Sequence, residues 1–417
     1  MEECTPMSAI AFDLPADVLT VRDGVLRFVE KDVVPRLERH HALLSDARQL
    51  YDARGAYAPE VRALIRDVRM ASAEAGFYSM CAPVSIGGGG LGHLAYYVAW
   101  EAIYRRLGGH AVVTPWVIAH WAFGPSPVLT QMTAEARERC LADMMAGRTS
   151  MCFGLSEPGA GSDATMIRTR AVRDGDGWKI TGRKLWTTNA PTADWCIVFA
   201  VTDADKAARK AGGISAFMVP TDAPGFCVES VVKLFGHPGG HEGALALEDV
   251  RVEPWQLVGA LDDGFKVALY GVSLGRVYNS ARAVGQGRWA LELALDYAKQ
   301  REAFGAKIAD YQGVSFPLAQ SASELHAAHL MGLNAAMLLD RGERAVKELS
   351  MAKSYAVQAG FRAVDRAMQT HGGMGLTNEV GLVHAWQDLR IVNIADGTNE
   401  ILAKTIAQRL LAGDVDL

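Results

Sequence analysis

The stretch Phe153-Gly-Leu-Ser-Glu-Pro-Gly-Ala-Gly-Ser-Asp163 is the most specific feature of this 417-residue sequence. Pro158 fixes one φ angle, and the two glycines that follow it let another molecule approach the backbone closely. Ser156 and Ser162 add hydroxyl groups. The stretch therefore predicts a tight turn whose amides and hydroxyls can meet the polar edge of a ligand. Taken alone, it is equally compatible with a loop that caps a helix between two domains.

Hydrophobic periodicity divides the chain into three zones around this stretch. In the first zone, apolar residues recur three and four positions apart, which is the spacing of amphipathic helices. In the middle zone the period falls to two and Gly-rich turns separate short apolar runs, which predicts β-strands. Long helical patterns return in the last zone. We predict an α+β protein with an N-terminal helical domain at 1–150, a middle antiparallel β domain at 151–260 and a C-terminal helical bundle at 261–417.

The first helix of the predicted bundle carries a long apolar stripe, which suits packing against antiparallel neighbours. Its members are Val267, Tyr270, Leu274, Val277, Ala281, Val284, Leu291, Leu295 and Ala298. Further helices are expected at about 314–339, 345–369, 380–393 and 400–411.

Composition and charge exclude several classes of protein. The net charge of −5 argues against a nucleic-acid binder, which usually presents a basic face. No apolar run approaches the roughly 18–20 residues that span a bilayer, so no membrane segment is expected. The six cysteines lack C-x-x-C spacing and the eleven histidines lack metal-ligand spacing. We therefore expect free, mostly buried thiols, no metal and, without a recognisable targeting segment, a cytoplasmic location.

Five further segments accompany the opening stretch in a fixed order. They are Gly182-Arg-Lys-Leu-Trp-Thr-Thr-Asn189, Gly243–Val252, Arg301-Glu-Ala-Phe-Gly-Ala-Lys-Ile308 with Gln312, Gln369-Thr-His-Gly-Gly-Met-Gly375 and Asp396-Gly-Thr-Asn-Glu400. Together the six segments resemble, in order and spacing, the motifs of the acyl-CoA dehydrogenase family, and the resemblance covers nearly the whole chain. The chain departs from the family pattern at Glu253, which precedes Pro254, and at Asp396, where the family carries glutamate.

The resemblance implies a helical domain, a β domain and a C-terminal four-helix bundle, with FAD bound between the β domain and the bundle. Trp186 would cover the isoalloxazine ring, and Thr188 would form a hydrogen bond near N5. Without the neighbouring motifs, Trp186 would be interpreted as a core residue of the β domain. The flavin-side contacts that the resemblance implies are Phe153, Leu155, Ser156, Gly161, Ser162, Trp186, Thr187 and Thr188.

Other family motifs contact the adenosine diphosphate end of a neighbouring subunit's FAD. This implies a homotetramer or homodimer, with electron-transfer flavoprotein as the electron acceptor. Arg301 would pair with the pyrophosphate, although alone it would be interpreted as a surface cation. The residues assigned to that end are Arg301, Phe304, Gln312, Gln369, Gly372 and Gly373, and Thr398 and Glu400 are also assigned to the cofactor.

An acyl-CoA thioester is the substrate that the resemblance implies, with contacts from Ser162, Arg276, Arg344 and Gly397. Arg276 matches an arginine near the thioester, and Arg344 roughly matches a basic residue near the CoA adenosine; either is also compatible with a solvated charge. Aromatic residues gather where the family shapes its acyl pocket, and most are expected to be core. They are Tyr96, Tyr97, Trp100, Tyr104, Trp116 and Trp121.

In this family a base takes the α proton while a hydride leaves the β carbon for flavin N5, giving the trans-2-enoyl-CoA. The base position here is Asp396, one methylene shorter than glutamate. Some relatives place the base on the first bundle helix, at a position that falls at about Gly275, which has no side chain. Asp396 is therefore the predicted base, next to a thioester carbonyl polarised by hydrogen bonds.

Two alternatives remain open at this point. Aspartate at the base position also occurs in a subset of the family and in related nitroalkane oxidases. The second hypothesis is therefore a flavin oxidase of the same fold that acts on a small carbon acid and does not need Arg276 or Arg344. A third is a non-catalytic acyl-CoA- or flavin-binding homologue, against which the retained Trp186, Thr188 and Arg301 argue.

Overall fold

The computed structural model describes residues 13–109 and 112–416. In its N-terminal part, α1 (Ala16–Phe28) continues through a π-helical turn (Val29–Val33) into α2 (Val34–Arg39). The short helices α3 (His41–Ser45) and α4 (Ala47–Leu50) follow, and then the longer α5 (Pro59–Glu74), α6 (Gly92–Leu107) and α7 (Ala134–Met145). α5 and α7 each bury one face, as the spacing of three and four predicts, whereas α6 buries every residue from Leu94 to Glu101.

The middle part is an eight-stranded sheet with the order β6-β7-β3-β2-β4-β5-β8, in which β1 also pairs with β4. The strands are β1 (Met151–Gly154), β2 (Arg170–Asp174), β3 (Gly177–Thr188), β4 (Trp195–Val201), β5 (Ile214–Pro220), β6 (Phe226–Val232), β7 (Glu242–Val252) and β8 (Leu257–Val258). The helix α8 (Ala204–Ala208) lies between β4 and β5.

The sheet is mixed, which corrects the prediction of an antiparallel β domain. Most neighbours are antiparallel, but β1 runs parallel to β4 along its whole length, and β2 meets β4 in parallel at Arg170 and Val201. Periodicity of two identifies strands but carries no information about their partners. Parallel pairing needs a long crossover, and here the stretch Phe153–Asp163 runs from the end of β1 into that crossover.

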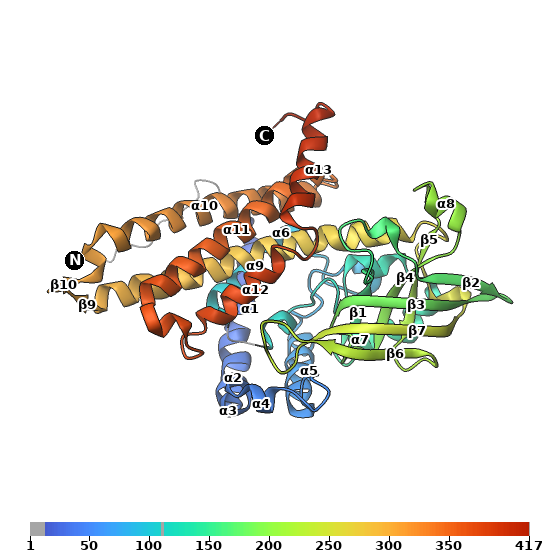
Figure 1. The fold of residues 1–417 in the computed structure, drawn as a ribbon, viewed down its shortest axis with the longest axis horizontal. Helices are drawn as coiled ribbons and strands as arrows, with labels where there is room; N and C mark the ends of the chain where they lie inside the picture. Colours follow the sequence, from blue (N-terminus) through green and yellow to red (C-terminus); the bar gives the residue numbers. More distant parts are fainter. Residues whose placement is uncertain (1–12, 110–111, 417) are drawn as a thin grey trace.

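The C-terminal part is helical and lies at the opposite end of the molecule from the sheet (Figure 1). The long helices α9 (Gly264–Gln300), α10 (Gln312–Asp340) and α11 (Val346–His371) pack on one another, and α12 (Leu382–Val392) lies against α11. A small hairpin of β9 (Glu302–Ala303) and β10 (Ala306–Lys307) joins α9 to α10, and α13 (Asn399–Leu411) is the last helix. The predicted helices are confirmed to within a few residues at each end.

The apolar stripe predicted on α9 is only partly buried. Most of its members are buried, but Tyr270 and Leu295 are exposed. Conversely, α9 buries several polar and small residues that the stripe omits, including Asn279 and Gly275, because other elements pack on more than one of its faces. A helix surrounded by neighbours cannot be described by one stripe.

One hydrophobic cluster runs through all three parts of the chain. It joins Trp100 of α6, Phe199 of β4 and Val277 of α9, so the sheet and both sets of helices share a core. The domain boundaries at 150 and 260 stay predictions, because the buried residues do not form a separate core on each side of them. Of the cysteines, Cys140, Cys152 and Cys196 are buried, Cys81 is half-buried, Cys227 is exposed and Cys4 lies outside the described residues.

Candidate functional site

Asp396 lies in the short connection between α12 and α13, in an unusual backbone conformation. Its φ is +54° and that of Gly397 is +96°, so two successive residues are left-handed. Such a conformation is costly for a residue with a side chain, although aspartate tolerates it better than most. Thr398 then caps the N-terminus of α13, and its hydroxyl oxygen accepts a hydrogen bond from the Ile401 amide at 3.3 Å. The turn therefore fixes the direction of the Asp396 side chain.

The Asp396 carboxylate is held and tuned by its neighbours. The Asn279 side-chain amide on α9 donates to its Oδ2 at 2.8 Å. Burial raises the pKa of Asp396 to about 6, while the positive charges of Lys353 and Arg276 and the hydrogen bond from Asn279 lower it. A carboxyl group with a pKa near neutrality is suited to removing a weakly acidic proton.

Lys353 anchors the same turn from α11. Its buried ammonium group donates to the Gly397 carbonyl oxygen at 2.8 Å. Burial lowers the pKa of Lys353 to about 8, and the negative charge of Asp396 opposes that shift. Sequence reasoning missed both Lys353 and Asn279. The available signal was a lysine and an asparagine inside segments of small and apolar residues, where an unpaired polar group is costly.

Gly275 on α9 lies directly against Asp396. A Cβ atom at this position would be 2.3 Å from the Asp396 Oδ2 and 2.9 Å from the Trp121 Nε1. The glycine is therefore needed, because any side chain would occupy the space of the carboxylate. The two alternative base positions considered from the sequence face one another, and only one can carry a side chain.

The predicted substrate residues are not all together. Arg276 is half-buried at the base, where its Nη2 lies 3.6 Å from the Cβ position of Gly397, and its Nε has no hydrogen-bond partner among the described residues. Burial lowers the pKa of Arg276, and Asp396 opposes this. Arg344 is exposed just before α11, six residues ahead of Ser350. The Ser350 hydroxyl accepts a hydrogen bond from the Arg276 Nη1 at 3.5 Å. Ser162 is exposed on the loop after β1.

Trp186 occupies a β-bulge in β3. The register between β3 and β7 shifts between Lys184 and Thr187, and Trp186 has a φ of +62° and is 52% exposed. A bulge re-aims a side chain out of the alternating pattern of a strand, so Trp186 is not a core residue of the β domain. Next to it, Thr187 is buried with no partner for its hydroxyl among the described residues, and Thr188 is half-buried.

The loop after β1 lies against this bulge. The Leu185 amide donates to the Ser156 carbonyl oxygen at 3.0 Å. Beneath the loop, a buried ion pair joins the Lys184 Nζ to the Glu157 Oε1 at 2.8 Å, and Lys184 also donates to the Leu155 carbonyl oxygen. Glu157 and Lys184 lie inside two of the predicted motifs, but the sequence predicted no role for them. In the structure they hold the loop after β1 against β3.

These residues fit a flavin. The exposed ring of Trp186, the half-buried Thr188 and a loop with open space around Gly159 and Gly161 lie together where the loop after β1 meets β3, and the buried Thr187 hydroxyl beneath them has no partner among the described residues. Phe153 and Leu155 are half-buried at its base. Within the described residues, no three His, Cys, Asp or Glu side chains gather in a way that could hold a metal ion. None of the described helices is both long and apolar enough to cross a membrane.

The residues predicted to bind the adenosine diphosphate end lie at the other end of the bundle. Arg301 and the fully exposed Phe304 follow α9, and the ring of His371 stacks on Tyr297 with centroids 4.5 Å apart, which brings Gly372 and Gly373 to the same end. Gln312 and Gln369 are exposed there as well. With a rise of about 1.5 Å per residue, Arg301 is roughly 39 Å along α9 from Gly275. Within one chain, Arg301 therefore lies far from the base turn.

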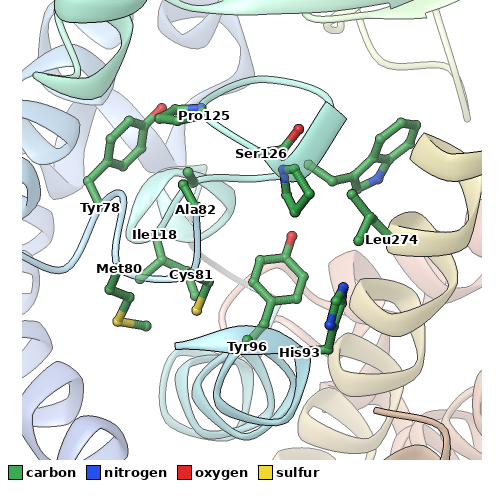
Figure 2. A pocket seen from close by; sticks show the side chains of 14 residues that line it. Tyr78, Met80, Cys81, Ala82, His93, Tyr96, Ile118, Pro125, Ser126 and Leu274 are labelled. Atoms are coloured by element: carbon green, nitrogen blue, oxygen red, sulfur yellow. The ribbon is translucent and has the colours of Figure 1, made fainter. Parts of the chain in front are cut away.

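A small, mostly apolar cavity lies beside the base (Figure 2). Trp121 and Leu274 line it, and Leu274 precedes Gly275. The Trp121 ring also contacts Phe153, with centroids 5.1 Å apart, so cavity, base and flavin surface adjoin. All six aromatic residues singled out from the sequence are buried, and Tyr96 and Trp121 are the two that line the cavity. Thr398 and Glu400, assigned to the cofactor, lie at the start of α13.

Comparison with known proteins agrees with this arrangement. The chain matches the N-terminal, middle and C-terminal domains of acyl-CoA dehydrogenases at residues 16–148, 152–250 and 262–411. It is 34% identical to a probable acyl-CoA dehydrogenase, YngJ, of Bacillus subtilis over 96% of this chain and 99% of that protein. It is also 34% identical to the caffeyl-CoA reductase-Etf complex subunit CarC of Acetobacterium woodii, over 81% of this chain and 88% of that protein.

The fold agrees as well. The butyryl-CoA dehydrogenase of Megasphaera elsdenii superposes with a TM-score of 0.81 at 27% identity, over 96% of this chain and all of that one. The family uses FAD, which the bulge and loop described above fit. The chain therefore belongs to the acyl-CoA dehydrogenase family and is an FAD-dependent oxidoreductase.

Proposed function

We propose that this protein interconverts an acyl-CoA and its trans-2-enoyl-CoA, with Asp396 as the base that takes the α proton. One observation carries the proposal. The Asp396 carboxyl group has a pKa near 6 and lies against Gly275, where no side chain competes with the carboxylate for space. Arg276 beside Gly397 supports a thioester bearing a CoA group over a small carbon acid.

The turn also offers a donor to the thioester carbonyl. Among the described residues, no group accepts a hydrogen bond from the Asp396 amide, so this N–H is available to a ligand. A donor aimed at the carbonyl oxygen stabilises the negative charge that develops when the α proton leaves. FAD, when bound, would supply the two-electron acceptor, taking the hydride at N5. Trp186, Thr187 and Thr188 would hold it.

We infer electron-transfer flavoprotein as the redox partner and a location in the cytoplasm. The relative named as a reductase-Etf complex subunit supports that partner, and it also supports the reverse direction, because the same base can return a proton to the α carbon. Anaerobic titration of the purified protein with a panel of acyl-CoAs tests the function. We expect the flavin absorbance to bleach; bleaching by nitroalkanes alone would establish the oxidase alternative instead.

Lys353→Met is expected to move the acid limb of the kcat/KM profile to higher pH. The variant removes a positive charge that lowers the pKa of Asp396, so the carboxylate forms only at a higher pH. Lys347→Met is the control, because this buried lysine on the same helix bonds Asp414 instead of the base turn. An acid limb that stays in place in Lys353→Met with full FAD content would exclude this charge coupling.

Arg301→Ala is expected to lower FAD occupancy and to weaken assembly. Arg301 lies on an exposed end of the bundle that also presents Leu295 and Phe304, as expected for a surface that meets another subunit. We infer a homotetramer or homodimer in which this end binds the partner's FAD. Light scattering and the ratio of flavin to protein absorbance measure both effects, with the exposed Arg209→Ala as control. A wild-type monomer with one FAD per chain would contradict the proposal.

A further inference from the structure

The cavity beside the base combines an apolar wall with polar atoms that have no partner. Its lining includes Met80, Cys81, Ile118 and Leu274. It also includes Tyr96, Trp121 and Ser126, which are 8%, 6% and 3% exposed. The Tyr96 hydroxyl, the Trp121 Nε1 and the Ser126 hydroxyl have no hydrogen-bond partner among the described residues. In Figure 2, Tyr96 of α6 and Ser126 lie on opposite sides of the cavity, and Ser126 belongs to the loop between α6 and α7.

The Tyr78 hydroxyl also lines the cavity without a partner among the described residues, and four unpartnered polar groups around one cavity are unusual. Buried polar side chains in folded proteins are nearly always hydrogen-bonded, to protein or to ordered water. Water can satisfy these groups while the cavity is empty. A purely apolar ligand would expel that water and leave the groups without partners, which weakens its binding. A ligand that carries an oxygen at the right depth would replace the water instead.

The charge of the lining narrows the class of ligand. No lysine or arginine lines the cavity. The lining includes the imidazole ring of His93, whose Nδ1 lies 2.9 Å from the Asp340 Oδ1, and Asp340 also accepts from the backbone amides of His93 and Leu94. This carboxylate next to the cavity disfavours a second negative charge inside it. The lining therefore suits an uncharged oxygen atom that accepts a hydrogen bond from the Trp121 Nε1 and forms hydrogen bonds with the Tyr96 and Ser126 hydroxyls.

The position of the cavity relates this oxygen to the reacting carbons. Trp121 and Asp396 both lie against the Cβ position of Gly275, and Leu274 is the residue before Gly275 on α9. An acyl chain whose α carbon lies at Asp396 would extend into this cavity. Resting on the proposed function, we propose that the preferred substrate is a thioester whose acyl tail carries an uncharged oxygen group, a hydroxyl or a ketone, that bonds Tyr96, Trp121 and Ser126.

Pairs of thioesters that differ in one atom test this proposal. Pentanoyl-CoA and 4-hydroxybutyryl-CoA place a methyl and a hydroxyl group at the same distance from the carbonyl, and hexanoyl-CoA and 5-hydroxypentanoyl-CoA repeat the comparison one carbon further out. Succinyl-CoA adds a carboxylate of similar length. Under anaerobic conditions, the second-order rate of flavin reduction is expected to favour the hydroxyl member of at least one pair by about tenfold or more. Succinyl-CoA is expected to be slower than both.

Variants assign the preference to the named side chains. Ser126→Ala and Tyr96→Phe remove one hydroxyl each, and together they are expected to reduce the preference to less than about twofold, chiefly by slowing the hydroxyl substrates. Tyr97→Phe is the matched control: its hydroxyl is also buried without a partner and it lies on the same helix, but it does not line the cavity. This control is expected to keep the preference.

The outcomes separate this inference from the function on which it rests. If no thioester bleaches the flavin, the proposed function fails. If the methyl members react as fast as their hydroxyl partners in the wild-type protein, the function stands and the polar-tail inference is overturned. The inference is also overturned if succinyl-CoA is the best substrate, or if the preference survives in the Ser126→Ala/Tyr96→Phe protein.

Discussion

Gly275→Ala is expected to slow flavin reduction by at least about 10²-fold while FAD content stays at the wild-type level. The new Cβ would lie 2.3 Å from the Asp396 Oδ2 and 2.8 Å from its Cγ, far inside contact distance. Asp396 cannot move away without losing its bond to Asn279 or its left-handed backbone. Misplacing a reacting group by about 1 Å is sufficient for a loss of this size. Anaerobic stopped-flow absorbance measures the rate.

A matched helix position separates this effect from a general cost of substitution. Gly313, in the first turn of α10, has no atom within 4 Å of its Cβ position, so Gly313→Ala is expected to leave the rate unchanged. A double variant tests the geometry further. Gly275→Glu combined with Asp396→Gly moves the carboxylate onto α9 and removes the clash, and is expected to recover part of the activity. A fully active Gly275→Ala protein would contradict the close packing on which this account rests.

Asp396→Asn is expected to reduce the rate of flavin reduction by at least about 10²-fold. The amide keeps the size of the side chain and the backbone N–H but cannot accept the α proton, and loss of a positioned base has at least this effect. FAD and product-like acyl-CoA should still bind, which difference spectra of the flavin can measure. Rapid and complete flavin reduction in this variant would exclude Asp396 as the base.

Asp396→Glu tests whether the site is shaped around the shorter side chain. Gly275 and Trp121 already enclose the aspartate carboxylate, so an extra methylene is expected to crowd the α carbon and slow the reaction. If straight-chain acyl-CoAs instead react as well or better, the glutamate merely restores the family arrangement. The single-turnover rate with one acyl-CoA distinguishes the two results.

Much of the fold follows from the sequence, because periodicity reports which face of each element is buried. The helices and strands lie close to where the spacing predicts them, and the resemblance of six motifs supplies their arrangement. Strand partners did not follow from the sequence: the parallel pairing of β1 with β4 depends on a crossover that no local pattern encodes. The exposed Leu295 on α9 likewise depends on what packs there, which a stripe on one helix does not specify.

The site shows the same division. Asp396, Gly275 and Arg276 were singled out from motif positions, and the structure brings them together at one turn. Lys353 and Asn279 were missed because a polar residue inside a small and apolar helical segment indicates burial but not its partner, and only the fold places them beside the base. Their effect on the Asp396 carboxyl group is electrostatic and acts across chain-distant segments, so no sequence pattern carries it. The outward direction of Trp186 depends on the β-bulge in β3, which the sequence did not predict.

The pH dependence of flavin reduction tests the central claim, that Asp396 is the base, most directly. Only the deprotonated carboxylate accepts a proton, so kcat/KM of the wild-type protein should rise as the pH increases through about 6 and reach a plateau above it. Stopped-flow measurements between pH 5 and pH 8, with a substrate that does not titrate in that range, give this profile. The account predicts an acid limb near pH 6 in the wild-type protein and a low, flat profile in Asp396→Asn. A limb near pH 6 that persists in Asp396→Asn would contradict it.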